Sequence, residues 1–350
     1  MRILIVKLSS IGDIVHTLPA LAAIKRALPD SEVHWAADAR ASAVLQHNPL
    51  LSGLIEVNTR SLRRKSVLGK TIGTARRQLR NLRASGFDLS IDFQGLLKSA
   101  TLARLAGVPF RAGFSRTELR EPASRHLLTH TIEVPARTNV ILRNIELAEK
   151  ALGEFQNDKN FTLDRETIEF PISIEQEHTE EADEISGLFE NDFAILNPAG
   201  GWKTKLWPAE NYGALADRIW EEFGLESLIC TAPNETDLAK AAALASRSGR
   251  SRSATPSLKG FYAIARRAKV YVGGDTGPTH LAVAAKCPVV GIFGPTEWWR
   301  NGSPFKEDLE VGRDDIDCRI DCHRRKCGNW ICMEIPVDKV LLGIRTRLGL

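Results

Sequence analysis

The sequence predicts an α/β protein made of two Rossmann-like domains, and three observations lead to this prediction. Short apolar runs alternate with helical stretches, a pattern typical of mostly parallel, doubly wound sheets. The alternation occurs in two series that are separated by a polar segment. With 350 residues, the chain also exceeds the size at which a single hydrophobic core normally stops growing.

The first series starts at the N-terminus, where the residues after Met1 form an apolar run typical of a buried strand. Its expected strands are Ile3–Leu8, Glu32–Ala36, Leu54–Val57 and Leu89–Asp92. Its expected helices are Ile14–Ala27, Ala41–Gln46, Lys70–Arg83 and Leu97–Ala106. We therefore expect an N-terminal domain over residues 1–175.

The second series follows a polar segment, Asn157–Glu190, which we interpret as the region linking the domains. Its expected strands are Phe193–Asn197, Ser227–Thr231, Val270–Gly273 and Val289–Phe293. Its expected helices are Asn211–Phe223, Thr236–Arg247, Leu258–Ala268 and Thr279–Ala285. A second domain is expected over residues 185–332.

Composition and apolar patterning exclude several classes of protein. The hydrophobic content of 43% and charged content of 26% are ordinary for a soluble globular protein. No apolar run approaches the roughly 18–20 residues that a transmembrane helix needs. The apolar run at the N-terminus is interrupted at Lys7, too soon for a signal peptide. We expect a cytosolic chain that can still bind a membrane surface.

A basic block runs from Arg60 to Arg83 within a chain of net charge only +4. It contains no Asp or Glu, and its Lys and Arg residues stand at positions 60, 63, 64, 65, 70, 76, 77, 80 and 83. Such a block indicates a site for polyanions, whether lipid head groups, phosphorylated glycans or nucleic acid. A solvated helix face is the alternative. Nucleic acid is disfavoured because no aromatic residues are interleaved for stacking on bases.

The glycine-rich segment after the expected strand Val270–Gly273 predicts an anion site. Ligands of open α/β sheets bind outside the carboxyl ends of the strands, and free N–H groups at a helix N-terminus favour phosphate. The three glycines of this turn (Gly273, Gly274, Gly277) allow close approach of a ligand and unusual backbone conformations. Thr276 or Thr279 can cap the helix. Asp275 and His280 go beyond what an ordinary structural turn, the alternative interpretation, would need.

Two further loops contribute to the predicted site in the second domain. The loop after Phe193–Asn197 carries Gly200, Gly201, Lys203 and Lys205, and lysines neutralise phosphate as point charges. Two lysines opposite a second phosphate-type loop indicate a diphosphate. Glu235, after the next strand, is suited either to a ribose hydroxyl or to a helix cap.

The loop after the first strand, Lys7–Pro19, offers a carboxylate on a tight turn. Ser9, Ser10 and Gly12 permit the turn, and Asp13 lies near the start of the following helix. Asp13 is either a helix cap or a general base at the edge of a cleft. The loop lacks the G-x-G-x-x-G pattern, which argues against an NAD-dependent dehydrogenase.

Four of the six cysteines are grouped near the C-terminus, at Cys318, Cys322, Cys327 and Cys332. In a cytosolic chain such a group indicates metal binding before disulfides. The spacing nevertheless differs from a pair of Cys-x-x-Cys knuckles. We assign the group no catalytic role, and we interpret Cys230 and Cys287 as small core residues.

Several motifs together resemble a known family. The opening segment Met1–Leu21 closely resembles the ADP-heptose:lipopolysaccharide heptosyltransferases, glycosyltransferase family 9. The resemblance covers nearly the whole chain, because it continues through Ile91–Ser99, Gly113–Arg116, Arg120–Ser124, Lys205–Pro208 and Gly273–Leu281. Some relatives have threonines just before the diphosphate lysine, where this chain has Gly200 and Gly201.

The resemblance implies a GT-B fold, with two Rossmann-like domains facing each other across the active-site cleft and a helix in residues 333–350 returning to the N-terminal domain. It implies that Asp13 is the catalytic base and that Lys205 contacts the donor diphosphate. With the loops above, the expected donor-binding residues are Gly200, Gly201, Lys203, Lys205, Glu235, Asp275, Thr276, Gly277, Thr279 and His280. The expected acceptor-binding residues are Ser9, Ser10, Gly12, Arg60, Arg63, Arg64 and Arg120.

The activity that the resemblance implies is inverting transfer of heptose from ADP-L-glycero-β-D-manno-heptose (ADP-heptose), without a metal or other cofactor. The basic block and the segment Arg120–Ser124 look most like the branch of the family that acts on the Kdo of Kdo-lipid A. The expected partners are ADP-heptose, that acceptor or a related lipid-linked one, and the anionic inner leaflet, with peripheral binding at the cytoplasmic face of the bacterial inner membrane.

Other interpretations of the same residues stay open. They are transfer to another position of the lipopolysaccharide core, a donor other than ADP-heptose, or a non-catalytic protein that binds nucleotide-sugars or polyanions. The sequence does not fix the oligomeric state, for which we expect a monomer.

Overall fold

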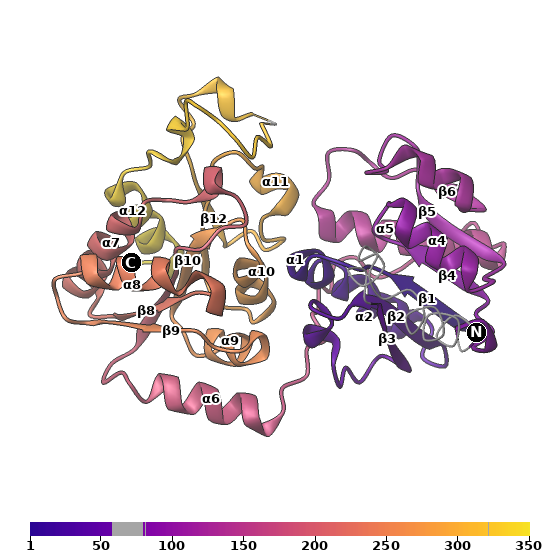
Figure 1. Ribbon diagram of the computed structural model, residues 1–350, viewed down its shortest axis with the longest axis horizontal. Helices are drawn as coiled ribbons and strands as arrows, with labels where there is room; N and C mark the ends of the chain where they lie inside the picture. Colours follow the sequence, from indigo (N-terminus) through magenta and orange to yellow (C-terminus); the bar gives the residue numbers. More distant parts are fainter. Residues whose placement is uncertain (58–79, 81, 321) are drawn as a thin grey trace, which may run out of the picture. The chain divides into compact units, whose positions relative to one another are not determined.

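The computed structural model describes residues 1–57, 80, 82–320 and 322–350 and divides into two compact units, Met1–Ser173 and Ile174–Leu350 (Figure 1). Each unit is built on one sheet of six parallel strands. Counted within its own unit, each sheet has the strand order third, second, first, fourth, fifth, sixth. This is the order of a doubly wound Rossmann-like sheet, which confirms the predicted α/β class.

The first sheet has the order β3-β2-β1-β4-β5-β6. Residues Ile3 to Val6 of its central strand are fully buried, as expected for a parallel strand covered on both faces. The register pairs Ile3 of this strand with Val33 on one side and with Leu89 on the other. The strands are β1 (Arg2–Val6), β2 (Glu32–Asp38), β3 (Gly53–Val57), β4 (Leu89–Asp92), β5 (Phe110–Phe114) and β6 (His130–Ile132).

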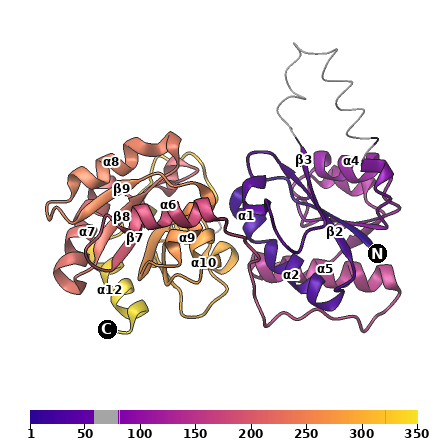
Figure 2. The same cartoon turned by 90° about the horizontal axis from the view of Figure 1, so that it is seen from below.

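Helices cover both faces of the first sheet (Figure 2). On one face, Leu4 and Val6 share a hydrophobic cluster with Ala103 of α4. On the other face, α2 and α5 pack against each other. The helices are α1 (Ile11–Val15), α2 (Leu18–Ala27), α4 (Leu97–Leu105) and α5 (Val140–Gln156).

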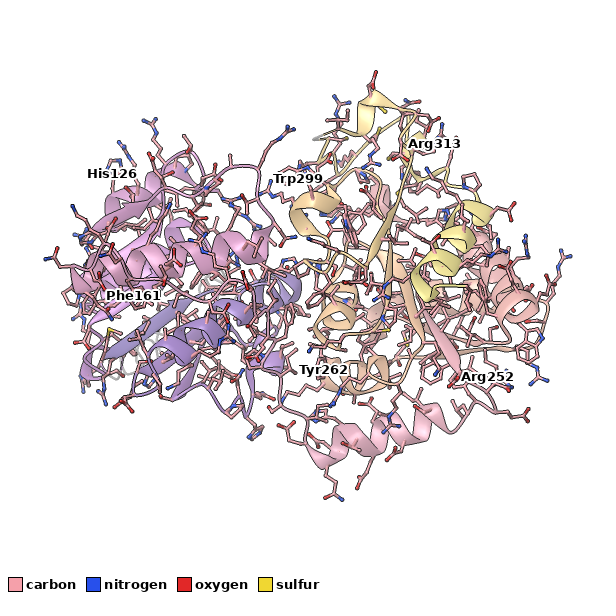
Figure 3. All side chains as sticks on the ribbon, turned by 180° about the vertical axis from the view of Figure 1, so that it is seen from behind. His126, Phe161, Arg252, Tyr262, Trp299 and Arg313 are labelled. Atoms are coloured by element: carbon pink, nitrogen blue, oxygen red, sulfur yellow. The ribbon has the colours of Figure 1, made fainter. Side chains whose placement is uncertain are left out.

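The second sheet has the order β12-β11-β10-β7-β8-β9. Its edge strand β9 is polar, and the charged side chain of Arg252 lies on it (Figure 3). Charged side chains on an edge strand oppose pairing with other chains. The strands are β7 (Phe193–Asn197), β8 (Glu226–Cys230), β9 (Ser251–Ala254), β10 (Val270–Gly274), β11 (Val289–Ile292) and β12 (Leu309–Val311).

Helices α7, α8 and α12 pack on one face of the second sheet and share its large hydrophobic cluster. Helix α9 packs against both α6 and α10. The helices are α6 (Gln176–Ser186), α7 (Ala209–Phe223), α8 (Thr236–Ala245), α9 (Leu258–Ala265), α10 (Gly277–Ala284), α11 (Trp298–Asn301) and α12 (Val337–Leu348).

Strand order locates the places where ligands can bind. In the first sheet the connection reverses direction between β1 and β4, and in the second between β7 and β10. In open α/β sheets such a topological switch point forms a crevice outside the carboxyl ends of the strands. The loops after β1, β7 and β10 carry most of the predicted site residues, and the loop after β4 carries none of them.

Several predicted elements differ from those in the structure. The predicted helix Ile14–Ala27 is two helices, because Pro19 cannot lie in a helix interior and instead occupies the first turn of α2. Segment Ala41–Gln46 forms only a short 3-10 turn, Ser42–Leu45. Strands β5, β6, β9 and β12 were not predicted, because they are short or polar. Most of the predicted helix Lys70–Arg83 lies outside the described residues.

The polar segment interpreted as a linker contains α6, and α6 packs against α9 within the second unit.

The expected return of the C-terminal helix to the N-terminal domain also differs from the structure. Helix α12 belongs to the second unit and packs against α7, β11 and β12 (Figure 1). The physical reason is its apolar face, where Val340, Leu341 and Ile344 complete the hydrophobic cluster of that unit. Among the described residues, no helix is both long enough and apolar enough to span a membrane.

Neighbouring leucines of α12 test this packing. Leu341 is 4% exposed, whereas Leu342 is 57% exposed. We expect Leu341→Ala to lower the free energy of unfolding by about 2–5 kcal/mol, because it leaves a cavity in the core. Leu342→Ala should change it by less than about 1 kcal/mol. Urea denaturation of both variants measures the two changes in the free energy of unfolding. Equal changes for Leu341→Ala and Leu342→Ala would contradict this packing of α12.

Candidate active site

Each unit holds a cluster of charged residues at the carboxyl ends of its central strands. The first cluster surrounds Asp13, in the first turn of α1. Its Oδ2 accepts hydrogen bonds from the backbone N–H of Ser10 at 2.8 Å and from the Ser10 hydroxyl at 3.2 Å. Its Oδ1 lies 3.7 Å from Nζ of Lys7 and 3.4 Å from Nη2 of Arg120. Asp13 therefore caps the helix turn with one oxygen and pairs with two cations through the other.

A turn after β4 holds the Asp13 loop in place. Oε1 of Gln94 accepts from the backbone N–H groups of Leu8 and Ser9, at 2.9 and 3.0 Å. Nζ of Lys7 donates to the carbonyl of Phe93 at 2.8 Å. Because β1 and β4 are neighbours, these bonds join two loops that are about one quarter of the chain apart in sequence.

Asp92 forms the base of this turn and is buried. Its Oδ1 accepts from the N–H groups of Gln94 and Gly95, at 2.8 and 3.1 Å, and its Oδ2 accepts from the Ser99 hydroxyl at 2.8 Å. Burial nevertheless raises the pKa of Asp92 to about 6, because these hydrogen bonds and the Lys7 charge only partly offset desolvation.

The electrostatics at Asp13 favour the carboxylate. Burial opposes ionisation of Asp13, but the charges of Lys7 and Arg120 and the hydrogen bond from Ser10 hold the pKa of this carboxyl well below its usual range. Burial lowers the pKa of Lys7, and the Asp13 and Asp92 carboxylates oppose that change. Asp13 is thus a hydrogen-bond acceptor at neutral pH and can receive a proton.

Arg120 is the exposed member of this cluster, since its side chain is 58% exposed. A long cation that is largely in solvent can bind an anionic ligand while it remains near Asp13. Ser9 and Gly12 belong to the turn that carries Asp13. The other predicted acceptor residues, Arg60, Arg63 and Arg64, lie outside the described residues.

The second cluster is centred on Asp275, in the turn after β10. Its Oδ2 lies 2.6 Å from Nζ of Lys205, which also donates to the Asp275 carbonyl at 3.1 Å. Its Oδ1 lies 3.3 Å from Nε2 of His280. Burial opposes ionisation, but the hydrogen bond from His280 and the charge of Lys205 hold the pKa of Asp275 well below its usual range. The structure therefore brings Lys205, Asp275 and His280 together, as the sequence predicted for one site.

A further contact holds the Lys205 ammonium. The ring of Trp202 lies beneath it, with Nζ 4.2 Å from the ring centroid. Lys205 itself belongs to a 3-10 turn, Lys203–Lys205, in the loop after β7. A lysine side chain that is 11% exposed and held at both faces loses little entropy when it binds an anion.

The turn Gly274–Thr279 is held together by hydroxyl groups. The Thr279 hydroxyl donates to the carbonyl of Gly274, and it lies 2.9 Å from the Tyr271 hydroxyl and 3.2 Å from that of Thr276. Thr276 is the N-cap residue of α10, but its side chain makes no capping hydrogen bond. The expected capping of α10 by a threonine side chain is therefore not observed. The first turn of α10 begins at Gly277, two residues after Asp275.

The glycines of this turn do not have the unusual conformations that we expected, since none of them has a positive φ angle. Their role is to provide space. A Cβ on Gly273 would lie 2.4 Å from the Tyr271 hydroxyl oxygen, and a Cβ on Gly274 would lie 3.4 Å from the carbonyl of Lys205. Glycine at position 273 leaves room for the Tyr271 side chain, and glycine at position 274 lets the β7 loop approach the β10 turn.

The remaining predicted donor residues lie around this cluster. Gly200 and Gly201 precede Trp202, and a Cβ on Gly201 would meet no atom within 4 Å. Lys203 is exposed and lies one residue beyond Trp202. Glu235 ends a 3-10 turn after β8, makes no side-chain capping bond to α8, and has a pKa that partial burial raises. The cap interpretation of Glu235 is thus not supported.

One group of possible metal ligands lies elsewhere in the described part of the second unit, at Glu175, Glu177 and His178. The buried ammonium group of Lys259 already neutralises one of these carboxylates, because it lies 3.1 and 3.0 Å from the two carboxylate oxygens of Glu175. The arrangement joins α6 to α9 and belongs to the packing of the unit.

Sequence reasoning missed Lys7, Asp92 and Gln94 as members of the first cluster. Each lies at or just after the end of a buried strand, and these strands are neighbours in the sheet. A charged residue directly after a buried apolar run was the available signal. In the second cluster, the prediction from the sequence missed Asn301, whose Nδ2 lies 3.4 Å from Oδ2 of Asp275.

The chain is similar to several known proteins. Residues 75–329 match the model of glycosyltransferase family 9 (heptosyltransferase). The chain is 30% identical over 331 residues to lipopolysaccharide heptosyltransferase 1 of Pseudomonas aeruginosa, covering 93% of this chain and 87% of that relative. It resembles the structure of E. coli heptosyltransferase WaaC with ADP-2-deoxy-2-fluoro heptose, with 25% identity, a TM-score of 0.75 and 99% coverage of both chains.

A second solved structure supports the fold. E. coli ADP-heptose lps heptosyltransferase II has 19% identity, a TM-score of 0.76, and coverage of 100% of this chain and 99% of that chain. Together with the two parallel six-stranded sheets, these similarities confirm the expected GT-B fold class.

The buried carboxyl of Asp92 yields a test of the first cluster. Its native pKa of about 6 exceeds the ordinary value of 3.8, so the native state binds this proton more tightly than the unfolded state. The resulting stability is fully present below the unfolded pKa and is lost as the pH rises through the native pKa. The difference between the native and the ordinary pKa of Asp92 corresponds to about 3 kcal/mol in the free energy of unfolding, since one pKa unit is about 1.4 kcal/mol.

Asp92→Asn keeps an oxygen acceptor for the two N–H groups but carries no charge. We expect the free energy of unfolding of this variant, relative to wild type, to rise by about 3 kcal/mol from about pH 4 to about pH 7. Urea denaturation across this pH range measures the difference. The exposed control Asp30→Asn should follow the wild-type profile, and an Asp92→Asn profile parallel to wild type would refute the assignment.

Proposed function

The chain belongs to glycosyltransferase family 9, the heptosyltransferases, and on this premise we propose that it transfers heptose from ADP-heptose to the Kdo of Kdo-lipid A. This is the reaction of heptosyltransferase I in the assembly of the lipopolysaccharide inner core. The observation that carries the proposal is the Lys205–Asp275–His280 cluster at the switch point of the second sheet. It provides a positioned cation for the diphosphate of a nucleotide-sugar.

The second unit provides the donor site in this proposal. The Lys205 ammonium binds the diphosphate, together with backbone N–H groups in the first turn of α10. Asp275 orients the lysine, with its Oδ2 2.6 Å from Nζ of Lys205, and His280 holds the other oxygen of Asp275. The similarity to E. coli heptosyltransferase WaaC, solved with ADP-2-deoxy-2-fluoro heptose, supports a donor of this class. Glu235, which is partly buried, is the candidate for the ribose hydroxyls.

The first unit provides the base. In the proposed step, Asp13 removes the proton of the acceptor hydroxyl while that oxygen forms a bond to the anomeric carbon of heptose. The bond from this carbon to the diphosphate oxygen breaks, and ADP leaves with the electron pair. Attack from the face opposite the leaving group inverts the anomeric configuration. Positive charge at Lys205 and α10 stabilises the negative charge that grows on ADP, so the step needs no catalytic metal.

Arg120 connects acceptor binding to the strength of the base. The ion pairs with Lys7 and Arg120 keep the pKa of Asp13 low, which alone makes a carboxylate a weak base. Kdo carries a carboxylate, and an exposed arginine is suited to bind one in bidentate fashion. When Arg120 binds the acceptor, Asp13 loses part of its stabilisation, and its pKa rises toward a value useful for proton transfer.

The acceptor assignment rests on similarity to lipopolysaccharide heptosyltransferase 1 over most of the chain and on the Arg120–Asp13 pair. A lipid-linked acceptor places the enzyme at the cytoplasmic face of the inner membrane, where basic residues bind anionic lipid with about 1 kcal/mol each. Transfer to a different core position is the second candidate, because the chain also resembles heptosyltransferase II in fold.

Substitution of Asp13 separates catalysis from donor binding. Asp13→Asn keeps an oxygen for the Ser10 N–H but cannot accept the proton, so kcat should fall by about 10²–10⁴-fold. The affinity for ADP, measured by calorimetry, should stay within about twofold, since Asp13 makes no donor contact in this proposal. Asp30→Asn serves as the exposed control. Full activity of Asp13→Asn would exclude the base assignment, and loss of both activity and ADP binding would indicate a folding role instead.

A comparison of acceptors decides between the two candidate reactions. Purified enzyme and ADP-heptose are supplied in parallel with Kdo-lipid A and with its monoheptosylated product, and the products are followed by mass spectrometry. We expect one heptose to be added to Kdo-lipid A and no turnover of the second acceptor. Turnover of the heptosylated acceptor alone would replace this proposal with transfer to the next core position.

A further inference from the structure

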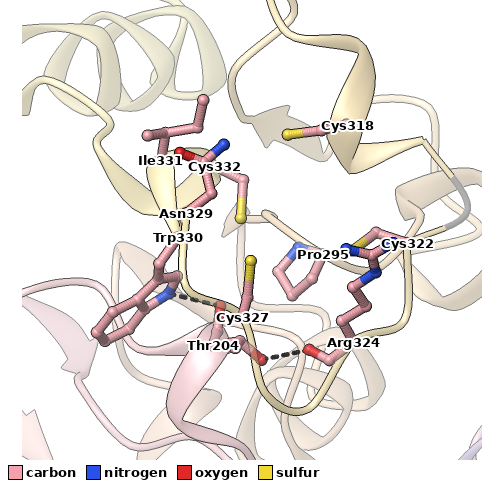
Figure 4. A pocket seen from close by; sticks show the side chains of 10 residues that line it. All are labelled: Thr204, Pro295, Cys318, Cys322, Arg324, Cys327, Asn329, Trp330, Ile331 and Cys332. Carbon is pink, nitrogen blue, oxygen red and sulfur yellow. Dashed lines mark hydrogen bonds between the residues drawn. The ribbon is translucent and has the colours of Figure 1, made fainter.

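Four cysteines of the second unit line one cavity, which the proposed function does not use. The cavity has a volume of about 80 Å³ and lies between the 3-10 turn Asp317–Arg319 and the 3-10 turn Ile331–Met333. Cys332 is buried, Cys322 is half-buried, and Cys318 and Cys327 are exposed. In Figure 4 the sulfurs of Cys327 and Cys332 point toward each other, and that of Cys318 points toward the same space. All four are free thiols in this structure.

Backbone donors and positive charge surround this group of thiols. The backbone N–H groups of Asn329 and Trp330 donate to the sulfur of Cys327. Hydrogen bonds of this kind, from residues two and three positions after a cysteine, stabilise metal-bound thiolates. The chain between Cys322 and Cys327 reads His-Arg-Arg-Lys. Its positive charge would offset the net double negative charge of a divalent ion bound by four thiolates.

We infer that Cys318, Cys322, Cys327 and Cys332 form a structural site for a thiophilic divalent metal ion, with Zn²⁺ as the ion that the ligand set fits best. Four thiolates with no open position are the ligand set of structural zinc, and soft sulfur ligands discriminate against Mg²⁺ and Ca²⁺. Binding of Zn²⁺ to four thiols forms four Zn–S bonds and releases four protons.

Metal binding requires a local rearrangement of residues 318–332. Among the described residues, no three of these four sulfurs lie within 4.8 Å of one another. Zn–S bonds of about 2.3 Å in a tetrahedron place the sulfurs about 3.8 Å apart. The two exposed cysteines, Cys318 and Cys327, can move into the cavity with the loop that carries them. Cys332 is fixed, because it belongs to the hydrophobic cluster of the unit.

The cysteine loop contacts the turn that carries the donor lysine. The Thr204 hydroxyl donates to the carbonyl of Arg324 at 2.8 Å, and Nε1 of Trp330 donates to the carbonyl of Thr204 at 3.0 Å (Figure 4). Arg325 lies over the same Trp202 ring as Lys205, with its guanidinium carbon 4.9 Å from the ring centroid. A metal that orders residues 318–332 would therefore also order Thr204 between Lys203 and Lys205. This consequence, unlike the metal site itself, rests on the proposed donor role of Lys205.

Metal analysis of the full-length protein tests the site. Protein purified without chelator is analysed for zinc, iron and other thiophilic metals by inductively coupled plasma mass spectrometry. We expect about one ion per chain, as for a structural tetrathiolate site. Replacement by Co²⁺ should produce the sulfur-to-cobalt charge-transfer bands of tetrahedral thiolate coordination. Both measurements use wild-type protein, so they stand even if a variant fails to fold.

Two variants and a control assign the ligands. Cys318→Ser and Cys327→Ser change exposed residues and should lose the bound metal and the cobalt bands. Cys287→Ser changes a cysteine in the core, outside the cavity, and should keep both. Absence of stoichiometric metal from the wild type, together with failure to take up Zn²⁺ after thiol reduction, would overturn the inference. It would do so whether the thiols are then found free or paired as disulfides.

The coupling to the donor site has a separate readout. Removal of the metal should weaken ADP binding by about tenfold, as expected for the loss of one well-ordered charged contact. Stoichiometric metal with no ADP binding in any sample would contradict the proposed function and leave the metal site standing. ADP binding that is unaffected by metal removal would overturn the coupling alone.

Discussion

A buried carboxylate needs a cation or hydrogen-bond donors beside it, and this constraint shapes both clusters. In the first unit Asp13 is held by Lys7, Arg120 and the N–H of Ser10. In the second unit Asp275 is held by Lys205 and His280. Removal of a buried partner, such as Lys7 or Lys205, typically costs about 3–5 kcal/mol, because the other charge is left without compensation. The loops that carry these residues are therefore fixed relative to the sheet from which they emerge.

The two units apply the same topology to different chemistry. Each has a lysine in or next to the loop after its first strand. Each also has an aspartate at the end of its fourth strand or directly after it, and the first and fourth strands are neighbours in the sheet. In the first unit the fourth-strand aspartate, Asp92, is buried and braces the loop, which leaves Asp13 as the carboxylate that can accept a proton. In the second unit Asp275 pairs directly with the lysine, so the cation is the group that is positioned. One cluster suits a base, and the other suits an anionic leaving group.

The sequence was sufficient to predict those parts of the site that lie within one loop. Asp13, Lys205, Asp275 and His280 follow buried strands, and strand ends are where ligands bind in such sheets. The contacts of Lys7 with Phe93 and of Gln94 with Leu8 depend on which strands are neighbours, and a single sequence gives no direct information on pairing. The packing of α12 could not be predicted for a similar reason, because the apolar residues of a helix do not show which sheet they pack against. The conformation of the glycine turn was predicted wrongly because glycine serves close packing as well as positive φ.

The central claim is that the Lys205–Asp275 pair is a diphosphate site, and calorimetry of nucleotide binding tests it most directly. ADP and AMP are titrated into wild-type protein and into Lys205→Met, with the exposed Lys240→Met as control. A charge-assisted contact to the second phosphate predicts that the wild type and the control bind ADP about 10–100-fold more tightly than AMP. Lys205→Met should bind both nucleotides with nearly equal, weaker affinity. An ADP preference that persists in Lys205→Met would contradict the claim.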